Sequence, residues 1–215
     1  MLNIVIIDDH ELVRTGFRLI LGQQADIRIV GEAGDGDAGL ALLRSLKPEV
    51  ALVDVHMPEV SGIQLTGRAR QLKLSTRIII VSMVGEAPLP RRLLEAGASG
   101  YLTKDCTAAE LLRAVRQVAD GRRYLAPEIA ESMALSALGT SRASPFESLS
   151  SRELEVALLL ARGQPMHRIA ARLSLSPKTV ATYKYRVFEK LEIDNAVTLA
   201  HLAHVHGLLD APATA

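Results

Sequence analysis

The sequence is poor in cysteine and has no long apolar segment. Cys106 is the only cysteine, so no internal disulfide is possible, which fits a reducing compartment. The longest unbroken apolar runs have about six residues, far short of the roughly 20 that span a bilayer. The start, Met1-Leu-Asn, enters a strand-like segment without the basic and apolar regions of a secretory signal. These absences favour a soluble cytoplasmic protein.

Overall charge is also nearly absent, because 25 basic side chains balance 24 acidic ones and leave +1. The total therefore predicts no particular partner. The charge is uneven, however: residues 162–190 hold seven Lys or Arg and one acid, a local charge of +6. Such a cluster can bind a polyanion, although many are only solvated faces.

The first 120 or so residues alternate five strand-like runs with five helical patterns. We expect strands near 3–7, 27–30, 50–54, 78–82 and 101–103, and helices near 11–21, 35–46, 62–72, 89–96 and 107–119. This alternation predicts an α/β doubly wound parallel sheet of five strands, flavodoxin-like, in the order 2-1-3-4-5.

The strand signal stops after this part. A short helix can begin at Pro127, and residues 139–145 are small and polar, as in a linker. Ser150 and Glu153 form a capping box that opens a helix to about residue 161. Further short helices near 166–173, 177–191 and 195–206 indicate a helix-turn-helix unit. We expect domain bounds of 1–121 and 147–215, joined by a linker at 122–146.

The third helix of this unit has two distinct faces. Val180, Val187 and Leu191 form an apolar stripe that suits a core. Another face is small, polar and aromatic, with basic flanks, and it carries Lys178, Thr179, Ala181, Thr182, Lys184, Tyr185 and Arg186. A face of this kind suits a DNA major groove, where the flanks hold phosphates and the face reads base edges.

Polar residues follow four of the predicted strands at their carboxyl ends: Asp8 and Asp9, then Asp54, Ser82 and Lys104. Because parallel strands bring these ends to one edge, the side chains should converge. Three close carboxylates repel, and Mg²⁺ would relieve that repulsion and let a phosphoryl group approach. Asp54 is then placed to form an aspartyl phosphate, with Lys104 and Ser82 on the phosphoryl oxygens.

Each residue also has a plainer explanation. Asp8 and Asp9 can cap the first helix, Ser82 can be an ordinary strand-end residue, and Lys104 a surface lysine. Tyr101 is most simply a sheet-edge aromatic, with a switch as the alternative. Convergence of four strand ends is hard to obtain by accident, so we favour the functional interpretation.

Two sets of motifs resemble a known family. Residues 1 to about 120 resemble the receiver domain of two-component response regulators, and residues 147 to about 210 resemble the LuxR-type helix-turn-helix of the NarL/FixJ subfamily. The carrying strings are Ile7-Asp-Asp-His10, Val53-Asp-Val-His-Met-Pro58, Val81-Ser82, Gly97-Ala-Ser-Gly-Tyr-Leu-Thr-Lys104, Leu149-Ser-Ser-Arg-Glu153 and Ser176-Pro-Lys-Thr-Val180. The segment 176–191 is especially similar to the GacA/UvrY/SirA group.

The resemblance implies a transcription regulator controlled by phosphorylation. Asp54 would accept phosphate from a sensor histidine kinase or its phosphotransfer domain. Asp9, Asp54 and the backbone carbonyl of His56 would hold Mg²⁺, with Asp8 assisting through water. Ser82 and Lys104 would contact the phosphoryl group, and Tyr101 would be an aromatic switch. A homodimer on double-stranded DNA, formed on phosphorylation, is also implied.

Two rival functions remain open. An aspartyl-phosphate phosphatase generally has a second acid two residues after its nucleophile, and here that position is His56. A protein-binding regulator whose helical part no longer binds DNA is disfavoured by the +6 segment. We therefore expect a regulator and not an enzyme.

Overall fold

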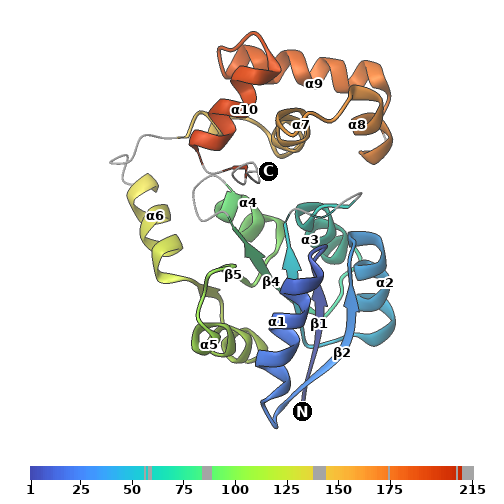
Figure 1. The fold of residues 1–215 in the computed structure, drawn as a ribbon, viewed down its shortest axis with the longest axis vertical. Coiled ribbons are helices and arrows are strands. Elements are labelled where there is room, and N and C mark those ends of the chain that lie inside the picture. The colour runs from blue at the N-terminus through green and yellow to red at the C-terminus, as the bar shows by residue number, and fades with distance from the viewer. Residues whose placement is uncertain are drawn as a thin grey trace. The chain divides into compact units, whose positions relative to one another are not determined.

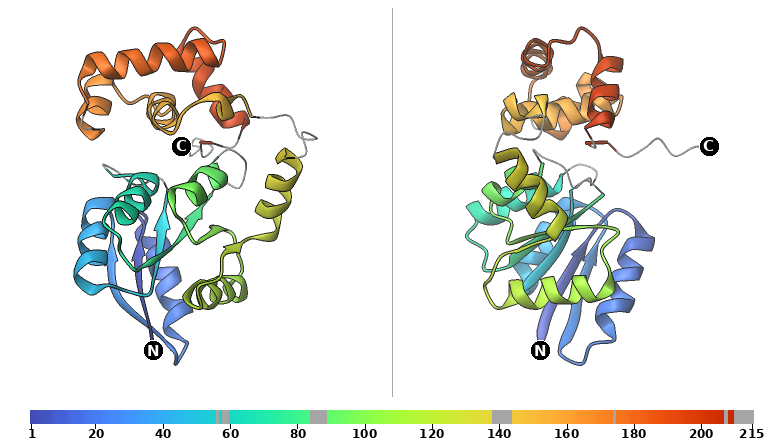
Figure 2. Two further views of the ribbon diagram at one scale, coloured as in Figure 1. Left: turned by 180° about the vertical axis from the view of Figure 1, so that it is seen from behind. Right: turned by 90° about the vertical axis from the view of Figure 1, so that its left-hand side faces the viewer.

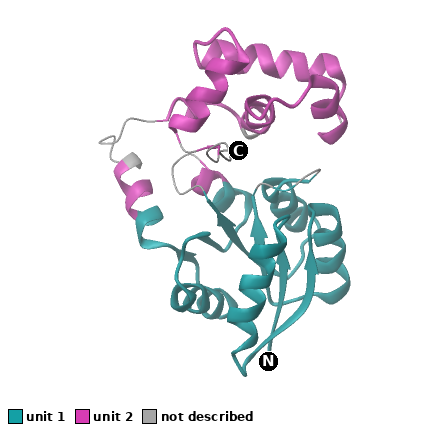
Figure 3. Cartoon of the chain, viewed as in Figure 1, with its two compact units in different colours: residues 1–83, 93–130 teal, residues 84–92, 131–215 magenta. Residues whose placement is uncertain are grey.

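The computed structural model describes residues 1–55, 57, 60–83, 89–137, 144–173, 175–206 and 208–209 (Figure 1). The chain divides into two compact units, residues 1–83 with 93–130 and residues 84–92 with 131–215 (Figure 3). Within the described residues, no helix is long and apolar enough to cross a bilayer.

A parallel sheet forms the centre of the first unit (Figures 1 and 2). Its strands are β1 (Leu2–Ile7), β2 (Ile27–Ala33), β3 (Val50–Asp54), β4 (Arg77–Ser82), β5 (Gly100–Thr103) and β6 (Tyr124–Leu125). Their order is β2-β1-β3-β4-β5-β6, which confirms the predicted order of the first five. β3 is buried along its whole length because helices cover both faces of the sheet.

Five helices connect these strands: α1 (Glu11–Gly22), α2 (Gly36–Leu46), α3 (Gly62–Gln71), α4 (Leu89–Ala96) and α5 (Ala108–Ala119). α1 and α5 pack on one face of the sheet, and α2 packs on the other with α3 beside it (Figures 1 and 2). The side chains of Asp35, Ser61 and Thr107 cap α2, α3 and α5. Gly97 ends α4 with a φ of +119°, in the left-handed region that glycine favours.

The sixth strand was not predicted, and it changes the surroundings of Tyr101. β6 pairs with β5, and Tyr101 lies opposite Leu125. Tyr101 is therefore fully buried, and the expectation of a sheet-edge aromatic is wrong. The hydroxyl of Tyr124 accepts a hydrogen bond from Arg113 at 2.9 Å and donates one to Glu110 at 3.1 Å, which fixes β6 to α5.

The remaining helices are α6 (Pro127–Ala137), the 3-10 turn η1 (Pro145–Ser148), α7 (Ser151–Ala161), α8 (Met166–Arg172), α9 (Pro177–Lys190) and α10 (Ala196–Val205). The predicted helices and the capping box of Ser150 and Glu153 are present. The 3-10 turn was not predicted. Residues 138–143, which include most of the small, polar segment 139–145, lie outside the described residues. Val180 and Val187 are buried in the helical core, where α9 packs on α7 and α8.

Candidate functional site

Asp8 and Asp54 lie side by side at the carboxyl edge of the sheet. Asp54 is the last residue of β3, and Asp8 directly follows β1. The register of the two strands places Ile7 opposite Val53, so the next residues are neighbours. Both aspartates are buried, although Asp9 beside them is exposed.

The ammonium of Lys104 lies between these two carboxylates. Its Nζ is 2.9 Å from Asp8 Oδ2 and 3.3 Å from Asp54 Oδ1. Lys104 follows β5, and its backbone N–H donates to the carbonyl of Ser82 at 2.8 Å, which joins the ends of β4 and β5. The side chains of Ser82 and Tyr101 are buried and share a hydrogen bond. Four strand ends thus bring Asp8, Asp54, Ser82 and Lys104 to one edge.

Burial dominates the electrostatics of this edge. The pKa of Asp54 is raised from 3.8 to about 6. Loss of solvation is the largest cause, and the neighbouring charges of Asp8 and Asp9 also raise this pKa, against the opposing effect of Lys104. Burial alone would lower the pKa of Lys104, but the carboxylates of Asp54 and Asp8 outweigh it and raise that pKa. The result is a concentrated negative site with one internal cation, to which a second cation or a phosphoryl group can be added.

Arg14 and Gly62 hold the backbone of this edge, and sequence reasoning missed both. Arg14 donates from Nη1 to the carbonyl of Asp8 at 2.7 Å. A Cβ on Gly62 would lie 2.3 Å from the carbonyl oxygen of Asp54, so only glycine lets α3 begin so close to the end of β3. No sequence pattern marks Arg14, whereas the position of Gly62 at a helix start was a weak signal.

The first turn of α1 tests the alternative explanation that Asp8 and Asp9 only cap this helix. The N-cap residue is His10, and no side chain caps this helix. Asp8 instead accepts a hydrogen bond at Oδ1 from the backbone N–H of His10, at 2.8 Å. Helix capping therefore does not account for the two acids.

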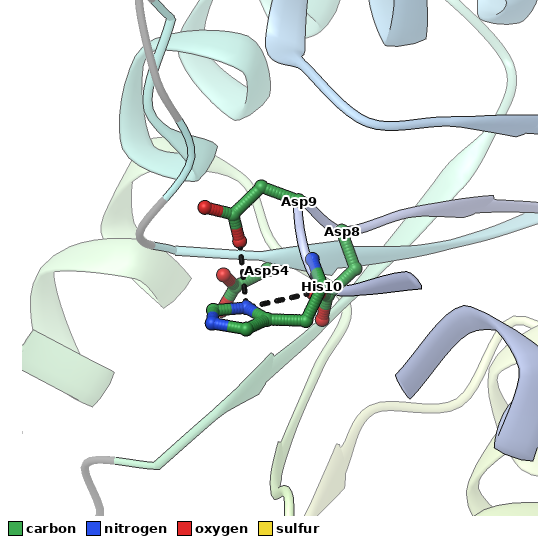
Figure 4. Close-up of side chains that lie close together, drawn as sticks. All are labelled: Asp8, Asp9, His10 and Asp54. Carbon is green, nitrogen blue, oxygen red and sulfur yellow. Dashed lines mark hydrogen bonds and ion pairs between the residues drawn. The ribbon is translucent and has the colours of Figure 1, made fainter. Parts of the chain in front are cut away.

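The donor set at this edge fits a divalent cation. Asp8, Asp9, His10 and Asp54 each offer one ligand atom, and these four atoms lie within 4.8 Å of one another (Figure 4). Oδ2 of Asp54 is buried and has no hydrogen-bond partner among the described residues. A buried carboxylate oxygen without a partner is costly, and a bound cation would satisfy it. His56, whose backbone carbonyl was expected to be a ligand, lies outside the described residues.

The exposed surface of α9 carries the side chains that the sequence assigned to DNA. Ser176 caps the helix by accepting from the backbone N–H of Thr179, with Pro177 at the first helical position. Tyr185 is 74% exposed, and Lys178, Thr182 and Arg186 are also exposed.

Three of the other α9 side chains are less free than the sequence suggested. The Thr179 hydroxyl is 2.8 Å from that of Ser176, so it takes part in the cap. Lys184 lies over the ring of Phe188, with Nζ 5.2 Å from the ring centroid, and Ala181 is half-buried. Fewer side chains of α9 are therefore fully exposed than the sequence predicted.

Family comparisons match both units of the chain. Residues 4–116 match the response regulator receiver domain, and residues 147–203 match the bacterial regulatory proteins of the luxR family. The chain belongs to the two-component response regulators with a LuxR-type DNA-binding domain. A response regulator of this kind is a phosphorylation-controlled transcription regulator and not an enzyme, which removes the phosphatase rival. Its partners are a sensor histidine kinase and DNA.

Relatives cover this response regulator almost completely. It is 43% identical to the response regulator GacA of Pseudomonas aeruginosa over 212 residues. The matched region covers 98% of this chain and 99% of the relative. It is 42% identical to the response regulator UvrY of Escherichia coli K12 over 212 residues, and this match covers 98% of this chain and 97% of the relative. The solved structure of RcsB from Salmonella enterica serovar Typhimurium, bound to promoter rprA with the phosphomimetic BeF3-, is 26% identical with a TM-score of 0.78 and covers 95% of this chain and 99% of that one.

Proposed function

We propose that Asp54 is the phosphoacceptor of this response regulator and that the reaction depends on Mg²⁺. The observation that carries the proposal is the buried Asp54 carboxylate, with one oxygen 3.3 Å from Lys104 Nζ and the other without a hydrogen-bond partner among the described residues. One oxygen is thus held in place, and the other is available for a new bond. We assign the Mg²⁺ site to Asp8, Asp9, Asp54 and the backbone carbonyl of His56.

In the proposed reaction a carboxylate oxygen of Asp54 attacks the phosphorus of a phosphohistidine. The new O–P bond forms as the P–N bond breaks, and the leaving imidazole keeps the electron pair. Lys104 balances the charge on one phosphoryl oxygen, and the hydroxyl of Ser82 donates to another. Bound Mg²⁺ supplies positive charge that reduces repulsion between the incoming phosphoryl group and the three aspartates.

Phosphorylation then changes the charge at a buried edge. A phosphoryl group adds nearly two negative charges, so it competes with Asp8 for the ammonium of Lys104. A hydrogen bond from Ser82 to the phosphoryl group would remove this hydroxyl from Tyr101, which we assign as the aromatic switch. We infer that this rearrangement favours a homodimer.

DNA binding is assigned to the exposed surface of α9. We propose phosphate contacts by Lys178, Lys184 and Arg186, and base contacts by Ala181, Thr182 and Tyr185, with Thr179 supporting the first turn. The exposure of Tyr185 and the local charge of residues 162–190 support this assignment.

We propose a receiver domain at residues 1–121, a linker at 122–146 and a DNA-binding domain at 147–215. The family matches at 4–116 and 147–203 support these bounds. Because the partner is chromosomal DNA, we assign its place of action to the bacterial cytoplasm.

The test of the phosphoacceptor is incubation with acetyl phosphate and Mg²⁺, followed by intact-protein mass spectrometry. We expect the wild type to gain the mass of one phosphoryl group, and chelation with EDTA to prevent it. Asp54→Asn should gain nothing, whereas Asp105→Asn, an exposed acid next to Lys104, should behave as wild type. Phosphoryl transfer to the Asp54→Asn variant would overturn the assignment.

A further inference from the structure

His10 lies over the acidic edge and has no role in the proposed reaction. It is the residue before α1, and its side chain is 63% exposed. The ring turns back toward the aspartates, so that Nδ1 lies 2.8 Å from Asp9 Oδ1 and 3.4 Å from Asp8 Oδ1 (Figure 4). The backbone of His10 is fixed in this position because its N–H donates to Asp8 Oδ1.

These separations suit atoms that share one metal ion. Ligands at about 2.0–2.1 Å from a six-coordinate ion lie about 3 Å apart when they are neighbours in its coordination shell. The two distances from His10 Nδ1, 2.8 and 3.4 Å, are close to this value. Asp54 belongs to the same cluster, and its buried Oδ2 has no hydrogen-bond partner among the described residues, which is an observation independent of His10.

A hydrogen bond is the competing explanation for the shorter distance. An Nδ1–H group of His10 that donates to Asp9 would also give 2.8 Å, and the ring would then have only a local role. The two explanations differ in what happens when a cation binds. A hydrogen-bonding ring gives up its partner to the ion, whereas a ligand ring bonds to the ion itself through an unprotonated Nδ1.

We propose that His10 is a further metal ligand of this site, through Nδ1, which rests on the metal site proposed above. The donor set is then carboxylate oxygens with one imidazole nitrogen. Carboxylate oxygen suits Mg²⁺ and Mn²⁺, and imidazole nitrogen favours later divalent ions such as Co²⁺, Ni²⁺ and Zn²⁺. The site therefore accepts Mg²⁺ and binds Co²⁺ more tightly than an all-oxygen site does.

Pulsed electron paramagnetic resonance of the full chain loaded with Mn²⁺ tests the ligand directly. We expect a nitrogen hyperfine signal from wild type that is absent from His10→Gln. His201→Gln is the matched control, because it removes an exposed histidine of α10 that has no part in the metal site, and it should keep the signal. A signal that persists in His10→Gln, or an absent signal in wild type with Mn²⁺ bound, would overturn the proposal.

Calorimetric titration with Co²⁺ and with Mg²⁺ gives a second readout. We expect His10→Gln to lose about tenfold or more in Co²⁺ affinity, with little change for Mg²⁺. Equal losses for both ions, or none, would count against a nitrogen ligand. Asp54→Asn separates this result from failure of the metal site itself. If wild type and Asp54→Asn bind Mn²⁺ equally, the site proposed above is wrong and the assignment of His10 falls with it.

Discussion

The strand-end cluster of Asp8, Asp54 and Lys104 differs from the surface of α9 in what holds each side chain. Asp8 and Asp54 are buried, and this burial is the main reason that the pKa of Asp54 rises to about 6. On α9, Lys178 and Tyr185 are exposed and only the helix positions them. A substitution in the cluster should therefore change stability, whereas one on α9 should change binding alone.

The largest effect is expected for Lys104→Gln. Loss of the ammonium leaves two buried carboxylates without their cation, which should lower the free energy of unfolding of the receiver by about 3–5 kcal/mol at pH 7. Urea unfolding followed by circular dichroism in EDTA measures it. Lys178→Gln is the control on α9 and should stay within about 0.5 kcal/mol of wild type. Equal effects of the two substitutions would remove the contrast between the regions.

The pH dependence of stability isolates Asp54. Because its folded-state pKa of about 6 lies above its ordinary 3.8, the folded state binds the proton more tightly. The stability from this group is complete below pH 4 and is lost as pH rises through about 6, by up to about 3 kcal/mol. Without metal, the free energy of unfolding of Asp54→Asn should therefore rise relative to that of wild type between pH 4 and pH 7. A difference that is constant with pH would show that Asp54 titrates normally.

A smaller effect is expected for Glu153→Gln in the helical domain. Glu153 completes the capping box of α7 and pairs with Lys190 at 2.7 Å. Burial opposes ionisation, but the contacts with Lys190 and Ser150 outweigh it and lower the pKa of Glu153. The variant should lose about 1–2 kcal/mol in thermal unfolding at pH 7. Because the pKa of Glu153 is lowered from 4.5, this loss should begin to shrink only below pH 4.5 and should disappear once folded wild type is protonated too. A loss that persists at that point would assign it to packing.

The smallest change in stability belongs to α9, where the readout is salt dependence. Lys178→Gln should weaken DNA binding uniformly across sequences and reduce the slope of log K against log salt by about one. Tyr185→Ala should instead weaken binding more for some sequences than for others. Fluorescence anisotropy on a panel of duplexes distinguishes the two variants. An unchanged salt slope for Lys178→Gln would show that Lys178 does not contact a DNA phosphate.

The sequence predicted the cluster well because the position of its residues follows from the backbone. Once strands β1, β3, β4 and β5 are parallel, their ends must meet, and no side-chain detail is needed. β6 was missed because its two residues are too few for a strand pattern, and it is held by the hydroxyl of Tyr124 against α5. The role of Gly62 depends on a close approach between distant segments, which no local pattern records.

The α9 surface was only partly predictable for a related reason. Helical periodicity places Val180 and Val187 in the core and the opposite residues outside, and both results hold. Helical periodicity does not predict which outward side chains already contact a neighbouring side chain. Thr179 contacts Ser176, and Lys184 lies over Phe188, and helical periodicity predicts neither of these local contacts.

The most direct test of the account is DNA binding with and without acetyl phosphate and Mg²⁺, on a duplex selected from a random pool by the phosphorylated protein. Wild type and Asp54→Asn are compared, and sedimentation reports the oligomeric state of each. The account predicts that the donor tightens binding and favours the dimer in wild type only. If the donor leaves both proteins unchanged, or changes both alike, Asp54 does not control the DNA-binding domain.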